Sequence, residues 1–231
     1  MNDHEALSAP SSDASALEQA GIVFVPLIRR RYLRELARYR LLLGTEGHLP
    51  PDRAEALILW WETLSSIMAN HHRALSQVLW ELLHDKGPEF EGLVAAMNQR
   101  HTMLHSSRSE AGRALKSALR EKGAPSSAQL SFIRFHEEVS ATSFWEEREI
   151  VSRALRCLSS VDWQRVESYA LASQAAEDRL GHALPWLLEE MPGEEADLVF
   201  ATFPPHVARL YETAWLPAYR QLADTAWPRS N

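Results

Sequence analysis

Long segments with an apolar residue at every third or fourth position dominate this chain of 231 residues, and short turns rich in Gly, Pro and Ser separate them. This spacing places the apolar side chains on one face of a helix, and each such face must be buried against another element. Alternation of apolar and polar residues, the pattern of a half-buried strand, extends over no useful length. The sequence therefore predicts an all-α protein.

Four long helices are predicted first, over residues 24–43, 52–83, 89–122 and 128–158. Asp52 is predicted to cap the second of them at its N-terminus. Short turns between long helices favour an up-down four-helix bundle, in which side chains from facing helices build interior sites. Shorter helices follow, and the last of them is predicted to be interrupted at Pro217.

The pattern divides the chain into three parts. Residues 1–20 are polar and rich in small side chains, as expected of a flexible tail. Residues 21–160 are predicted to form the bundle. Residues 161–231 are predicted to form a C-terminal helical extension that packs on it.

Composition limits the partners and the location that we expect. A formal net charge of −7 argues against a nucleic-acid partner, because such a protein needs a basic face. No apolar run approaches the roughly 18 residues of a spanning helix, so no membrane partner is expected. The N-terminus lacks the basic and apolar regions of a signal peptide, and Cys157 is the only cysteine. A cytoplasmic protein that binds a small molecule is expected.

Polar imidazoles interrupt the apolar pattern of the second helix, in the stretch "MANHHRALSQVLWELL". Helical spacing points His71 inward and places His72 nearer the edge of the same face. In the third helix His101 is predicted to point inward, with His105 one turn further on. Cys157 is predicted to be a core residue.

Four separated stretches resemble the hemerythrin-like, or HHE cation-binding, family. They are "LILWWETLSSIMANHHRALSQVLWELL", "LVAAMNQRHTMLH", "FWEEREIVSRALRCLSSVDWQRV" and "LPWLLEEMPGEEADLVFATFPPHVARLYETAWLPAYRQ", the last similar to the C-terminal helices of bacterial members. The resemblance implies a hemerythrin-like up-down four-helix bundle with additional C-terminal helices. It also implies a bridged di-iron centre, held inside the bundle by several His and Glu or Asp side chains.

Most ligand positions of the family are changed in this chain. His71 and His101 match family histidines, but the glutamate one turn after the first falls on Leu75, and the acid beside it falls on Ser76. The family glutamate of the fourth helix matches Glu146 or Glu147. The histidine one turn before it falls on Thr142 or Ser143, and the first helix offers no histidine. This set is too small for two metal ions, so no cofactor is expected.

Three interpretations of the remaining histidines stay open. The first is a single-metal site of His71, His101, His105 and Glu146, as in a non-haem iron protein that binds or activates oxygen, nitric oxide or peroxide. In the second, His71 and His101 are core residues hydrogen-bonded to Thr142 or Ser143, and the chain is a non-catalytic interaction module. The third is a central pocket now used for a small apolar or aromatic molecule.

The third interpretation is preferred, because loss of the metal and its carboxylates can leave a cavity with polar and aromatic walls. The histidines would then act as polar anchors, or as acid and base in a reaction without di-iron. The residues proposed to carry the chemistry are His71, His101 and His105, with Glu146 and Thr142 as their partners. The residues proposed for the pocket are Trp61, Met68, Leu75, Met97, Phe144 and Trp145.

Overall fold

The computed structural model describes residues 24–45, 49–120, 125–176, 180–189, 191, 193–201 and 203–228. Within these ranges every regular element is a helix, so the prediction of an all-α chain is confirmed. The predicted tail at residues 1–20 lies outside the described residues. No helix of the described part combines the length and the apolar character required to cross a membrane.

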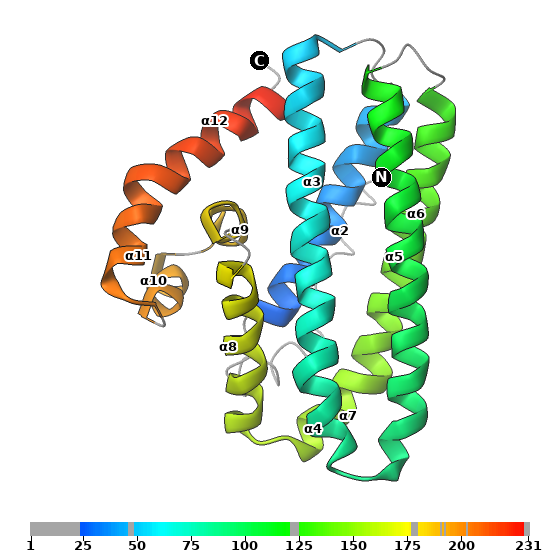
Figure 1. Ribbon diagram of the computed structural model, residues 1–231, viewed down its shortest axis with the longest axis vertical. Coiled ribbons are helices and arrows are strands. Elements are labelled where there is room, and N and C mark those ends of the chain that lie inside the picture. The colour runs from blue at the N-terminus through cyan, green and yellow to red at the C-terminus, as the bar shows by residue number, and fades with distance from the viewer. Residues whose placement is uncertain are drawn as a thin grey trace, which may run out of the picture.

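Four long helical stretches lie side by side, and consecutive stretches point in opposite directions (Figure 1). They are α2 (Phe24–Thr45); α3 (Pro51–Ala74) with the π segment η1 (Leu75–Leu79) and α4 (Trp80–His84); α5 (Glu91–Arg120), preceded by the 3-10 turn η2 (Pro88–Phe90); and α6 (Pro125–Glu146) with the π segment η3 (Glu147–Val151) and α7 (Ser152–Cys157). Helix α2 packs against α6, α6 against α5, and α5 against α3. These four stretches form the bundle.

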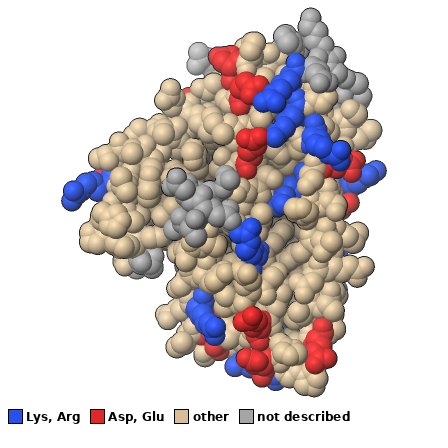
Figure 2. Space-filling model, viewed as in Figure 1, with Lys and Arg blue, Asp and Glu red and all other residues tan. Residues whose placement is uncertain are grey.

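The remaining helices cover one side of the bundle (Figure 1). They are α8 (Ser160–Ala176), α9 (Leu180–Leu188), α10 (Gly193–Ala201), α11 (Pro205–Leu210), the π segment η4 (Tyr211–Trp215) and α12 (Leu216–Ala226). Both α8 and α12 pack against α3. Figure 2 shows acidic and basic side chains interspersed along the bundle on the face that it presents. The predicted division after residue 160 stays a prediction.

The N-terminus of α3 differs from the prediction. Asp52 is not the N-cap: that position is Pro50, and no side chain caps the helix. Pro51 can begin the helix because its fixed φ suits the first turn, where its missing N–H would have no partner anyway. Asp52 therefore lies within the first turn, where a negative charge is favourable at the positive end of the helix dipole.

A Ser or Thr hydroxyl within or directly after each of the three described π segments donates to the carbonyl four residues earlier. The pairs are Ser76 with His72, Ser152 with Arg148, and Thr213 with Arg209. Such bonds compete with the backbone ladder and bend helices. The segment η4 also lies just before Pro217, which cannot donate to the ladder, so the predicted interruption there takes the form of a π turn.

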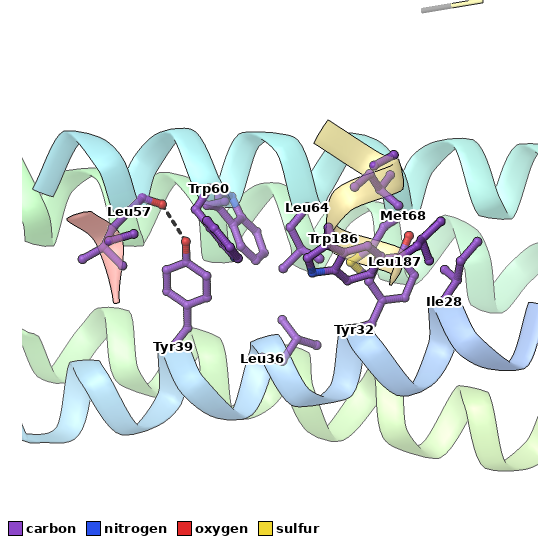
Figure 3. Close-up of a cluster of buried hydrophobic side chains, with 14 of the residues drawn as sticks. Ile28, Tyr32, Leu36, Tyr39, Leu57, Trp60, Leu64, Met68, Trp186 and Leu187 are labelled. Carbon is purple, nitrogen blue, oxygen red and sulfur yellow. Dashed lines mark hydrogen bonds between the residues drawn. The ribbon is translucent and has the colours of Figure 1, made fainter. Parts of the chain in front are cut away.

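Two adjoining apolar clusters fill the interior. The larger one joins α2, α3, α5 and α6 to α9 and α12, and it holds most of the large aromatic rings. In Figure 3, Tyr32 and Tyr39 of α2 point towards α3, and the Tyr39 hydroxyl donates to the Leu57 carbonyl at 2.6 Å. The smaller cluster surrounds η1 and η3 and includes Leu75 and Ile150. The histidines of α3 lie where the two clusters meet along that helix.

Candidate functional site

Three histidines meet between α3 and α5. The rings of His72 and His101 are stacked, with centroids 4.1 Å apart and planes inclined by 13°. The ring of His71 lies 5.8 Å from that of His72. His71 is 5% exposed and His101 9% exposed. Among the described residues, neither ring nitrogen of His101 has a hydrogen-bond partner, and Nδ1 of His71 has none.

Burial keeps these imidazoles neutral. It lowers the pKa of His71 to about 3, with smaller contributions from His101 and Arg29. Burial also lowers the pKa of His101 to about 4. The pKa of His72 falls well below its ordinary value, first through burial and then through His101, His71 and Arg108. A neutral imidazole has one N–H donor and one acceptor nitrogen, so each ring can bind a partner through either function.

Two further polar groups belong to this cluster. Tyr32 of α2 meets His71 edge to face, with ring centroids 6.2 Å apart, and its buried hydroxyl has no hydrogen-bond partner in the described chain. Burial raises the pKa of Tyr32 well above its ordinary value, and Arg108 lowers it by a smaller amount. Arg108 of α5 is itself 8% exposed, and burial lowers its pKa. We call Tyr32, His71, His72, His101 and Arg108 the polar cluster.

Glu146 lies on α6, one residue before η3, and is also buried. Burial raises the pKa of its carboxyl to about 7; Arg29 lowers that pKa and Glu147 raises it by smaller amounts. The Arg29 guanidinium is held by Glu147 at 3.4 Å and donates to the Ser143 carbonyl at 3.3 Å. A carboxyl group with this pKa is present in both protonation states near neutral pH.

Two π segments lie next to these polar residues. Leu75, which begins η1, comes one turn after His71, and Glu147, which begins η3, directly follows Glu146. Single π turns within α-helices occur often at functional sites, because the extra residue changes the direction of the side chains around it. Leu75 and Ile150, from the two segments, belong to the same apolar cluster.

The structure buries four of the five residues that we predicted to carry the chemistry: His71, His101, Thr142 and Glu146. His105 is exposed, so the prediction that it points inward beside His101 is wrong. It sits on the outer side of α5, where its Nδ1 accepts a hydrogen bond from Nη2 of Arg108 at 2.9 Å. The interpretation of His101 as a core histidine bonded to Thr142 or Ser143 is also wrong, because its ring nitrogens are unbonded.

The predicted pocket residues divide into three groups. Phe144 is 65% exposed, so its placement in an interior pocket is wrong. Trp145 is partly buried at the edge of the smaller cluster, with the Arg100 guanidinium 4.6 Å from its ring. The other four are buried in the core: Trp61 and Met68 in the larger cluster, Leu75 and Met97 in the smaller.

Neither of two cavities lined by described residues borders the polar cluster. One has a volume of about 10 Å³, space for a single water, and lies between Trp60, Trp186 and Tyr219. The other, about 280 Å³, is an open groove beside Arg34, Arg38 and Trp227. Neither of these cavities is the interior pocket that the sequence predicted beside the histidines.

The described residues do not fit a di-iron centre. Leu75 is apolar and Ser76 has no carboxylate, so the second helix supplies one matching ligand, His71. A single-metal set with His105 is incomplete too, since that side chain is outside the bundle. In the part of the chain that the structure describes, no group of three or more His, Cys, Asp or Glu is arranged to hold a metal ion.

Comparisons with protein-family models, with curated proteins and with solved structures find no match to this chain. The resemblance to the hemerythrin-like family thus stays a prediction from sequence motifs. Three residues of the polar cluster, Tyr32, His72 and Arg108, were not predicted as site residues. The sequence did carry a signal for Arg108, because it is a charged residue at an inward position between Leu104 and Ala111.

Proposed function

We propose that this chain is a bundle of the hemerythrin type without the family's di-iron centre, and that its polar cluster binds a small apolar or aromatic molecule. The observation that carries the proposal is the set of unbonded, buried nitrogens of His71 and His101. Nearly all buried polar groups in proteins are hydrogen-bonded. Polar atoms that lack a partner within the protein therefore favour a partner that comes from outside it.

The arrangement of the helices supports the hemerythrin-type part of the proposal. Four long stretches alternate in direction, and each packs against its neighbours (Figure 1). His71 and His101 lie on the packed helices α3 and α5, and Glu146 is buried on α6. These are the three positions at which the sequence keeps residue types that the family uses as ligands.

The chemistry that fits these groups is binding with proton transfer. Neutral His71 and His101 can each accept or donate a proton, and Glu146 titrates near neutral pH. The apolar surroundings supply a contact surface for the rest of the molecule, including Met68 and the Tyr32 ring. We place the entry of the molecule at η1 and η3, where the regular helical ladder beside the cluster is interrupted.

Nitrobenzene, a neutral aromatic quencher of tryptophan fluorescence, tests the binding site. Binding inside the bundle gives saturable quenching, whereas collisions at the surface give quenching that stays linear with concentration. We expect a saturable component in the wild-type protein that is lost in His101→Ala and retained in His84→Ala, a matched change of an exposed histidine. Quenching that is linear in the wild-type protein contradicts the proposed site.

Metal analysis tests the second part of the proposal. The protein is incubated with ferrous iron without oxygen, passed through a desalting column and analysed for iron. We expect no stoichiometric iron, because the described residues lack a suitable ligand set. Retained iron at one or two ions per chain, with a new absorption band on exposure to oxygen, would show that the centre is a metal site.

A further inference from the structure

Arg108 is a buried residue, and its guanidinium group, which reaches the exposed His105, has no opposite charge beside it among the described residues. This guanidinium donates a hydrogen bond to Nδ1 of His105, and among the described residues no carboxylate forms an ion pair with it. Other buried or half-buried arginines differ: Arg29 pairs with Glu147, and Arg38 pairs with Glu35. A buried charge without a partner destabilises a fold, so the position of Arg108 calls for a functional reason.

The polar groups near Arg108 are hydrogen-bond donors, and none of them is an anion. The Tyr32 hydroxyl is buried, lacks a partner in the described chain and lies close enough to Arg108 for each to shift the other's pKa. The imidazole of His101 adds an unpaired N–H because both of its ring nitrogens are unbonded, and His71 adds a second in the tautomer protonated at Nδ1. A cation and several unpaired donors in one apolar interior form a setting that favours an acceptor with a negative charge.

We infer that the polar cluster is a site for the carboxylate group of a small organic acid, with Arg108 as the cationic partner and the Tyr32 hydroxyl as a further donor. The inference rests on the proposed function, since it names the class of molecule that the same cluster takes. A carboxylate matches the planar fork of a guanidinium and carries one charge, which one arginine neutralises. A phosphate group carries about two negative charges at neutral pH, more than one arginine neutralises.

The rest of the acid meets apolar side chains. Arg108 lies between Leu104 and Ala111 on α5, and both belong to the larger apolar cluster together with Met68. The ring of Trp186 lies 5.7 Å from the ring of Tyr32 (Figure 3). An aromatic or short alkyl acid therefore suits the site better than a polar acid with several hydroxyl groups.

Benzoate is a suitable probe, with benzyl alcohol as its uncharged counterpart. We expect benzoate to raise the thermal midpoint of the full chain saturably relative to chloride at equal ionic strength, and benzyl alcohol to raise it less. Arg108→Met, which keeps side-chain length and removes the charge, should weaken benzoate binding by about tenfold or more. Arg113→Met, a change of an exposed arginine on the same helix, should leave binding unchanged.

Benzoate protection that is equal in the wild-type protein and in Arg108→Met overturns the inference, as does equal binding of benzyl alcohol to the wild-type protein. If Arg108→Met does not fold, Tyr32→Phe provides the test. Loss of benzoate binding in this variant, with nitrobenzene binding retained, supports the site. Retention of benzoate and nitrobenzene binding overturns it. Saturable nitrobenzene binding without benzoate binding overturns the carboxylate site and leaves the proposed function standing. Failure of both probes overturns both.

Discussion

The rings of His72 and His101 lie nearly parallel, 4.1 Å apart, and join the helices α3 and α5 at the centre of the polar cluster. Protonation of either ring in this contact would place a charge against an aromatic face in an apolar interior. Burial is the main reason that the pKa values of both are lowered. The packing of α3 against α5 is therefore coupled to the protonation state of these side chains.

Acid should destabilise the folded chain through these histidines. The pKa of His101 is about 4 in the folded chain against an ordinary 6.5. Its contribution to the free energy of unfolding is therefore full above pH 6.5 and is lost as the pH falls through 4. This shift corresponds to about 3 kcal/mol. His101→Phe keeps a ring and cannot titrate. We expect its free energy of unfolding, measured with urea, to fall less than that of the wild-type protein between these pH values. An equal loss in the variant, or the same benefit in the exposed control His84→Phe, contradicts the prediction.

Glu146 should have the opposite effect. Its pKa is about 7 in the folded chain against an ordinary 4.5, so its contribution to stability is full below pH 4.5 and is lost as pH rises through 7. Glu146→Gln, which mimics the protonated form, should be more stable than the wild-type protein above pH 7 by about 3 kcal/mol.

Urea unfolding on both sides of the titration checks this. Below pH 4.5 the advantage of Glu146→Gln should disappear, because the wild-type carboxyl is then protonated as well. Glu147→Gln is the matched control: it weakens a partly exposed pair with Arg29, so it should cost at most about 1 kcal/mol at neutral pH. A pH-independent difference for Glu146→Gln would mean that this carboxyl does not titrate as stated.

Periodicity predicted the long helices because an apolar stripe at helical spacing has few other ways to be buried. It also placed His71 and His101 correctly in the interior, whereas Glu146, also buried, was proposed from the family resemblance. It could not place both Phe144 and Glu146 there, because residues two apart on a helix point to different sides. The same geometry explains His105, which lies beyond the edge of the face that His101 and Leu104 share.

Neither the π segments nor the buried polar groups without hydrogen-bond partners could be predicted from the sequence. The segment η1 has the sequence "LSQVL", whose apolar residues fit an ordinary α-helix equally well. The sequence therefore gives no sign of the π turn. Helical spacing places Arg108 on the inward side of its helix, but whether a buried charge has a partner depends on residues distant in the chain. Tyr32 is adjacent to three arginines in sequence and still points inward, as only the packing of α2 against α9 reveals.

Gly112 allows α5 to approach Trp61 closely. A Cβ atom at this position would lie 3.3 Å from Cε2 of Trp61 and nearer still to Nε1. Overpacking should therefore outweigh the gain in helix propensity, and Gly112→Ala should lower the free energy of unfolding by about 1–2 kcal/mol. Gly92, at the start of the same helix, has nothing within 4 Å of an added Cβ. Gly92→Ala should be neutral or stabilising by up to about 1 kcal/mol in the same urea titration, and equal effects at both positions would contradict the close approach.

Glu35 is a buried carboxylate that joins α2 to α3. It is fully buried, and it accepts hydrogen bonds from Nε1 of Trp60 at 3.0 Å and from Arg34 and Arg38 at 3.1 and 3.2 Å. The Arg38 guanidinium also lies 4.2 Å from the ring of Trp227, which follows α12. Through these contacts the carboxylate holds the two arginines that face the C-terminal helices.

Replacement of Glu35 by leucine should therefore lower the free energy of unfolding by about 3–5 kcal/mol, because the Trp60 N–H and two partly buried arginines lose their shared anion. Glu62→Leu provides the matched control. That carboxylate pairs with Lys116 at 2.6 Å on the exposed side of the bundle, and its loss should cost at most about 1 kcal/mol. Adding Arg38→Leu to Glu35→Leu should recover part of the loss, since it removes a cation that has lost its partner. Equal costs for the two single changes, measured by urea unfolding at neutral pH, would show that the buried carboxylate contributes no more than a surface pair.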